Sequence, residues 1–83
     1  MAETKRMKLT DSWQSVGTDI GLLVQKEGSG DVKLSYSVNT PTTDKAAYVL
    51  KSDVAITLPA ATNGASIYAK TKAVDTYLNY TEV

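Results

Sequence analysis

The segment VKLSYSVN, residues 32–39, alternates apolar and polar residues at every position. Val32, Leu34, Tyr36 and Val38 fall on one side, and Lys33, Ser35, Ser37 and Asn39 fall on the other. Successive side chains of a β-strand point to opposite faces of its sheet, so this period of two predicts a strand with one buried face. The chain is therefore expected to fold as a β domain.

A second alternating segment precedes this one. In residues 20–25, Ile20, Leu22 and Val24 alternate with Gly21, Leu23 and Gln25. The linking sequence EGSGD supplies two glycines for a turn. Two alternating strands joined by a short glycine-containing link are typical of an antiparallel hairpin, and we predict one here.

The middle of the chain, KAAYVLKSDVAITLP, allows two interpretations. Val54, Ile56 and Leu58 alternate with polar or small residues, which favours two short strands broken near residues 52–53. The alternative is a one-turn helix over residues 44–48, because Asp44 could cap its first turn.

The sequence LPAATNGASIYAKT then suggests a tight turn. Asn63 and Gly64 both tolerate the positive φ angles of such a turn, which predicts a hairpin between a strand at 54–58 and one at 66–71. A last strand is expected at 74–81. In all, about six to seven short strands are predicted to form a small antiparallel β-sandwich or barrel, an all-β fold.

The first eleven residues differ in character from the rest. They are polar, and Lys5, Arg6 and Lys8 form a basic cluster. We predict a flexible or docking N-terminal arm over 1–11, whose cluster could meet acidic groups of a neighbouring subunit, and a single β domain over 12–83. Because the start lacks the apolar core of a secretion signal, the expected product is cytoplasmic, with no membrane span.

The residue inventory argues against most site chemistry. The chain has no Cys and no His, which removes thiolate metal sites, most zinc sites and histidine-based catalysis. Its acids are spread singly, without the spacing of a calcium loop. We therefore predict no catalytic residue, no metal and no cofactor, and a protein that is not an enzyme. A net charge of zero also gives no attraction to nucleic acid or to a membrane.

Aromatic residues are the best candidates for contacts, because they combine an apolar body with a polar tip. Trp13 is expected to close one end of the core, and Tyr36 and Tyr80 follow the apolar faces of their strands. The other tyrosines fit the opposite faces. The candidate interface residues are Tyr48, Tyr68, Lys70 and Tyr77, together with Lys5, Arg6 and Lys8.

The order of short motifs resembles small virion proteins of tailed bacteriophages. In that pattern an early W-x-x-V segment is followed by an x-x-P-T loop, a short strand and a late G-x-x-[IV]-[YW]-A-[KR] segment. The matching residues, within a span of roughly 12–83, are Trp13, Val16, Pro41, Thr42, Leu50, Gly64, Ile67, Tyr68, Ala69 and Lys70.

This resemblance implies a non-enzymatic structural role in the virion, as a capsid-decorating or head-associated subunit. It implies contacts with capsid or other virion proteins and a homo-oligomer, with a trimer favoured. The alternative is a small carbohydrate- or ligand-binding β module, such as a host-adsorption component, with Tyr48, Tyr68 and Tyr77 as a stacking platform.

Overall fold

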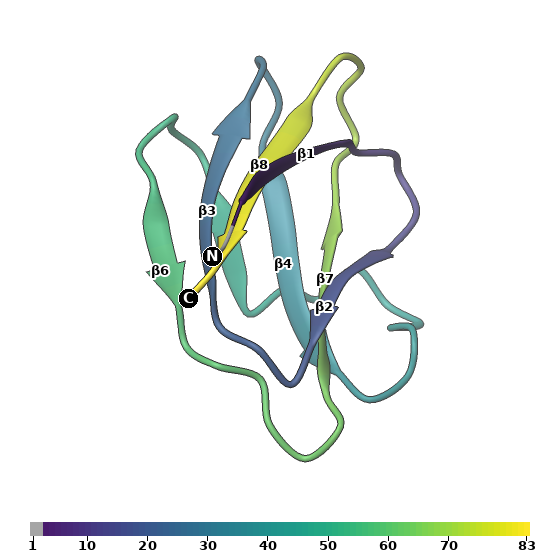
Figure 1. Cartoon of the computed structure of the whole chain (residues 1–83). Helices are drawn as coiled ribbons and strands as arrows, with labels where there is room; N and C mark the ends of the chain where they lie inside the picture. The colour runs from purple at the N-terminus through teal and green to yellow at the C-terminus, as the bar shows by residue number, and fades with distance from the viewer. Residues whose placement is uncertain (1–2) are drawn as a thin grey trace.

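A computed structural model describes residues 3–83 of the chain and contains eight β-strands in that range (Figure 1). They are β1 (Thr4–Lys8), β2 (Gln14–Thr18), β3 (Leu22–Glu27), β4 (Val32–Ser37), β5 (Tyr48–Leu50), β6 (Ile56–Leu58), β7 (Ser66–Lys70) and β8 (Tyr77–Glu82). All strand pairs are antiparallel, and residues 3–83 contain no helix. The predicted all-β class is confirmed, as is the preference for two short strands over a helix near residue 44.

The strands form two four-stranded sheets. Sheet I has the order β1-β8-β3-β6, and sheet II has the order β2-β7-β4-β5. The pairs β1·β8, β2·β7, β3·β6 and β4·β5 show that the first half of the chain runs antiparallel to the second half as a wound ribbon. Eight strands wound in this order make a jelly roll, a double-sheet form of the predicted β-sandwich.

The core lies between the sheets and is built by the alternation seen in the sequence. Leu22 and Val24 of β3 face Val32 and Leu34 of β4, and each of these side chains is at most 1% exposed. The other strands and connections contribute Leu9, Leu50, Leu58, Ala61, Ile67, Ala69 and Leu78. Tyr36 and Tyr80 pack against this cluster, as their positions in the sequence predict.

The predicted hairpin between residues 20–25 and 32–39 is wrong. β3 belongs to sheet I and β4 to sheet II, so the two strands face each other across the core. Alternation identifies the buried face of a strand, but it does not say whether the next strand lies beside it or opposite. The four-residue link at 28–31 can span about 13 Å, which is enough to cross the ~10 Å between packed sheets.

The hairpin predicted around Asn63 and Gly64 is wrong for the same reason, because β6 and β7 lie in different sheets. The turn itself forms: φ is 58° at Asn63 and 80° at Gly64. It sits within the longer connection 59–65, where the Gly64 amide donates a 2.7 Å hydrogen bond to Asp19 Oδ1. Positive φ therefore marks a turn here without marking a pair of bonded strands.

The N-terminal segment differs from the predicted arm. Residues 4–8 form β1, the edge strand of sheet I, and Leu9 is buried in the core. The added strand is one reason for eight strands where six to seven were expected. Residues 1 and 2 of the predicted arm lie outside the described part of the chain. β1 pairs with β8 because its backbone continues the ladder, even though its side chains are mostly polar.

Candidate functional site

The outer side of sheet I carries ten side chains that point away from the core. We call this surface the open face: Thr4, Arg6, Lys8, Leu23, Gln25, Glu27, Thr57, Tyr77, Asn79 and Thr81. The strand register arranges them in three rows, namely Thr4-Thr81-Leu23-Thr57, Arg6-Asn79-Gln25 and Lys8-Tyr77-Glu27. Every member is exposed or half-buried.

An ion pair crosses the open face from one strand to another. Arg6 Nη2 of β1 lies 2.6 Å from Glu27 Oε2 of β3, across the intervening strand β8. Asn79 Nδ2 donates to the other oxygen, Glu27 Oε1, at 3.2 Å. The Arg6 guanidinium also lies 3.9 Å from the centre of the Tyr77 ring. These contacts hold the charged groups flat on the sheet surface.

The row Thr4-Thr81-Leu23-Thr57 has no charged side chain and contains one apolar residue. The Thr4 and Thr81 hydroxyls are 2.8 Å apart, and Leu23 beside them is 38% exposed. A hollow of about 100 Å³ opens between the first and second rows, lined by Thr4, Leu23, Val24, Gln25, Ala55, Asn79 and Thr81. A hollow of this size has room for one side chain of a partner rather than for a cofactor, since ligand pockets usually exceed ~300 Å³.

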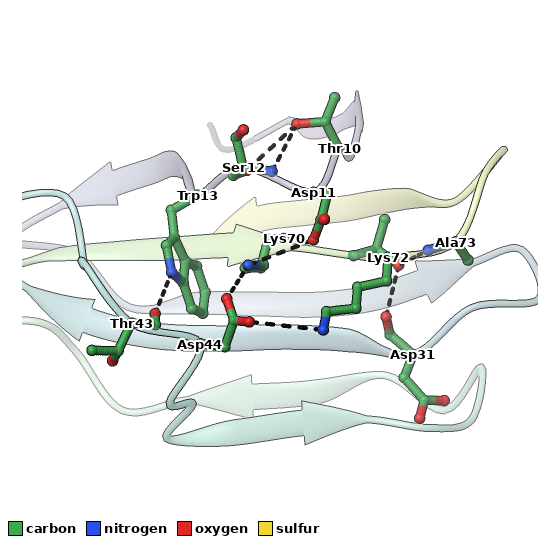
Figure 2. A network of polar contacts seen from close by, with 11 residues as sticks. Thr10, Asp11, Ser12, Trp13, Asp31, Thr43, Asp44, Lys70, Lys72 and Ala73 are labelled. Atoms are coloured by element: carbon green, nitrogen blue, oxygen red, sulfur yellow. Dashed lines mark hydrogen bonds and ion pairs between the residues drawn. The ribbon is translucent and has the colours of Figure 1, made fainter.

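The outer side of sheet II is covered instead over its middle, while Val49 at one edge stays 45% exposed. The connection between β4 and β5, residues 38–47, crosses it, and we call this connection the strap. Trp13 Nε1 donates a 2.8 Å hydrogen bond to the Thr43 carbonyl, and Lys70 Nζ donates to Asp44 Oδ1 (Figure 2). Asp11 Oδ1 lies 3.6 Å from the same ammonium, which is also 5.4 Å from the centre of the Trp13 ring.

The charges under the strap stabilise one another. The hydrogen bond from Lys70 lowers the pKa of the Asp44 carboxyl, with further help from the nearby charges of Lys70, Lys72 and Lys33. The same hydrogen bond raises the pKa of Lys70 above 10.5, against the effect of its burial. Lys70 therefore stays protonated at neutral pH, and an ammonium is neither a nucleophile nor a base. What this arrangement does is anchor the strap.

A hollow of about 360 Å³ lies beside the anchored strap, lined by residues 35–37, 41–43 and 45–47. Two further hollows lie near Lys70. One, of about 320 Å³, is lined by Asp11, Ser12, Trp13, Lys70 and residues 40–44. The other, of about 410 Å³, is lined by Asp31, Lys33 and residues 70–73. Lys70 lines both of these hollows, but its Nζ already donates a hydrogen bond to Asp44 and is not free to bind a ligand.

The structure separates the predicted interface residues into groups. Arg6, Lys8 and Tyr77 gather on the open face, while Lys5 lies on β1 opposite the half-buried Tyr80. Tyr68 and Lys70 point to the outer side of sheet II, where they are only 8% and 5% exposed. Tyr48 lies at the edge strand β5, 39% exposed, with its ring centre 6.3 Å from that of Tyr36.

The three tyrosines of the alternative platform therefore lie on three different surfaces. Trp13 also differs from the expectation, because it is half-buried outside the core and holds the strap. It directly precedes β2, whose Gln14 pairs with Ala69, and its ring lies beside the Lys70 ammonium on the outer side of sheet II. The strap gives it a hydrogen-bond partner there, which the apolar core would not.

Sequence reasoning missed Glu27 and Asp44. Glu27 was detectable, because it continues the alternation of Leu23 and Gln25 on the polar side of β3. Asp44 was noticed only as a possible helix cap. Its partner Lys70 lies 26 residues away, and no local pattern joins a loop acid to a strand lysine at that separation.

Within residues 3–83 no cluster of three or more potential metal-ligating side chains is present. The same part of the chain has no helix that could cross a membrane. Comparison of the sequence with protein-family models, and of the chain with curated proteins and solved structures, found no match.

Proposed function

We propose that this protein is a non-enzymatic structural subunit of a tailed-bacteriophage virion, a decorating or otherwise head-associated protein that contacts the capsid through its open face. The observation that carries the proposal is the contrast between the two broad surfaces. Sheet II is covered by its own strap, whereas sheet I presents a complete four-stranded outer surface. The motif order from Trp13 to Lys70 supplies the association with virions.

The shape of the molecule supports attachment by this surface. The domain is a plate with extents of 32 × 32 × 16 Å, and its broad sides are the two sheets. A side of that size is comparable with the roughly 800 Å² that each partner buries in a standard stable interface.

The jelly roll is compatible with this role but does not decide it. Capsid domains, lectins and cupins all use double-sheet jelly rolls, and a fold hosts many functions. The argument therefore rests on the surface. The open face carries Arg6 and Lys8 along one edge, the Tyr77 ring and the exposed Leu23 among threonines, a mixture that suits protein contacts better than a single-charge surface does. Repetition by symmetry follows from such a role, with a trimer as the first expectation.

The test measures incorporation into particles. Virus particles from a culture carrying the gene would be purified by density gradient, and the chain quantified against the major capsid protein by mass spectrometry. We expect a fixed ratio that survives the gradient. Particles that lack the chain would overturn the proposal.

A matched pair of variants then tests the open face. Thr57→Arg places a long charged side chain on the open face without altering a contact of β1, and Thr62→Arg places it on the exposed connection 59–65. We expect T57R to lower the amount in particles at least tenfold, while T62R is retained. Equal retention of both variants would rule out the open face as the contact surface.

A further inference from the structure

Strand β1 is the least buried strand among the described residues. It is an edge strand near the start of the chain, and its only strand neighbour is β8. Four of its five residues are exposed, and only Met7 packs against the core. The edge strand β2 has the same length, but three of its residues are half-buried. β1 can therefore leave its sheet with little loss of burial.

The basic side chains of β1 lie next to acidic side chains of the domain. β1 carries Lys5, Arg6 and Lys8, and its polar contacts go to Glu27 at 2.6 Å and Asp75 at 3.9 Å. The Thr4 hydroxyl contacts that of Thr81, and the Arg6 guanidinium lies over Tyr77. Apart from the Met7 packing, these contacts are with side chains of β8, with Glu27 of β3 and with Asp75 just before β8. An identical strand from another copy could make every one of them.

The point where β1 joins the domain is fixed. Leu9 is 2% exposed, its amide donates to the Thr76 carbonyl at 2.9 Å, and the Thr71 amide donates to the Thr10 carbonyl at 2.9 Å. These contacts hold the chain from Leu9 onward in the core and leave the preceding residues as a separate unit. A hinge just before Leu9 would move β1 and leave residues 9–83 in place.

We propose that β1 is exchanged between copies of this chain, so that residues Thr4–Lys8 of one copy pair with β8 of a second. An exchanged strand makes the same contacts as the original, so the change in free energy is confined to the hinge and the loss of independent motion. At low concentration a chain keeps its own strand, because that strand has the higher effective concentration. Exchange increases where copies are crowded, as on a repeating lattice.

This inference names a second copy of the chain as a partner in the proposed function. It rests on the proposed function in one respect, because a virion lattice is what would bring copies close enough to exchange β1. The two can fail separately. A chain that enters particles through the open face but never exchanges β1 would disprove the inference alone. A chain that exchanges β1 but is absent from particles would disprove the proposed function alone.

The absence of cysteine allows a direct test by single-cysteine crosslinking. Thr4→Cys, labelled with ¹⁵N, and unlabelled Thr81→Cys are mixed at high and low concentration, refolded together from urea and oxidised. Thr4 and Thr81 are register partners, so the yield of mixed dimer exceeds that of random collision only when β1 of one copy lies on β8 of another. Mass spectrometry separates the mixed dimer from either homodimer.

The matched control is Leu23→Cys with Thr57→Cys, a register pair of β3 and β6 whose two members are exposed. Movement of β1 does not separate that pair. We expect the T4C and T81C mixture to yield at least fivefold more mixed dimer than the control mixture, with an excess that grows with concentration. Mixed dimer at the control level, or in the 2:1:1 ratio of random collision, would overturn the inference.

Discussion

Sheet I and sheet II have four strands each, yet the side chains on their outer surfaces differ in how far they are buried. On sheet II the outward residues Tyr68 and Lys70 are as buried as many core residues, because the strap and Trp13 lie over them. On sheet I the outward residues remain exposed or half-buried and satisfy one another through cross-strand contacts. Both sheets nevertheless show the same alternation of apolar and other residues along their strands.

The difference shows how a small domain can gain burial without a larger core. An 83-residue chain buries only about 60–65% of its unfolded surface. The strap adds a second layer of contacts on one side, whereas polar cross-strand pairs on the other side contribute only about 0.2–1 kcal/mol each. One side of the molecule therefore supports stability, and the other side is left for contacts.

The largest expected effect is on the free energy of unfolding, when one tyrosine on the outer side of each sheet is replaced by alanine. Tyr68 is 8% exposed beneath the covered side of sheet II, so Tyr68→Ala should lower the free energy of unfolding by about 3 kcal/mol, as for large buried aromatic residues. Tyr77 is half-buried on the open face, and Tyr77→Ala removes mainly its contact with Arg6, worth about 1 kcal/mol. Urea unfolding followed by circular dichroism measures both.

The order of the two variants is the decisive result. Losses of equal size would mean that the strap contributes no more burial than the open face, and the contrast between the sheets would be lost. A Tyr68→Phe control keeps the ring, so it should retain most of the stability if burial of the ring is the cause.

A smaller effect is expected from the strap's neutral anchor. Trp13→Phe keeps an aromatic ring but removes the hydrogen bond from Nε1 to the Thr43 carbonyl, which contributes about 1 kcal/mol. Local opening of the strap should then be roughly fivefold more frequent. Trypsin cleavage after the exposed Lys45, timed by mass spectrometry, measures this opening.

The same digest contains its own control. Lys51 is exposed in the connection between β5 and β6, which has no contact with Trp13. Cleavage after Lys51 should be unchanged in the Trp13→Phe variant. If both sites accelerate together, the substitution has weakened the whole domain and the strap is not a separate unit.

The fold class was predictable from the sequence because alternation determines which residues are buried. Val32, Leu34, Leu22 and Val24 all lie in the core as their spacing indicates. The pairing of strands was not predictable, and both expected hairpins proved to be connections between sheets. A four-residue link permits either a turn within one sheet or a crossing to the other, and the choice depends on strands far away in the chain.

The candidate surface was predictable only in part. Arg6, Lys8 and Tyr77 were selected for their residue types, and β1 brings them together because it pairs with β8. Tyr68 was selected for the same reason and is buried, since the strap that covers it begins 30 residues earlier in the sequence. Whether an outward residue is exposed depends on such distant segments, so alternation cannot decide it.

The smallest expected effect is a loosening of the strap on sheet II at low pH, with no matching change on sheet I. The pKa of Asp44 lies below its ordinary value of 3.8, because the carboxylate accepts a hydrogen bond from Lys70 and lies near Lys33 and Lys72. Its contribution to holding the strap is therefore fully present above that ordinary value and is lost as the pH falls through the lowered pKa. Asp44 is half-exposed, so water screens the pair and the change should be local and modest.

Trp13 is the only tryptophan in the chain, and it reports on the strap directly. Its emission should stay constant from pH 7 to about pH 4 and shift to longer wavelength below, while circular dichroism of the sheets changes later or not at all. In Asp44→Asn the carboxylate is absent, so the shift tied to its titration should disappear. A shift that persists unchanged in that variant would show that the acid transition does not come from the Asp44 carboxylate, and the hydrogen bond from Lys70 to Asp44 would then not be the contact that anchors the strap.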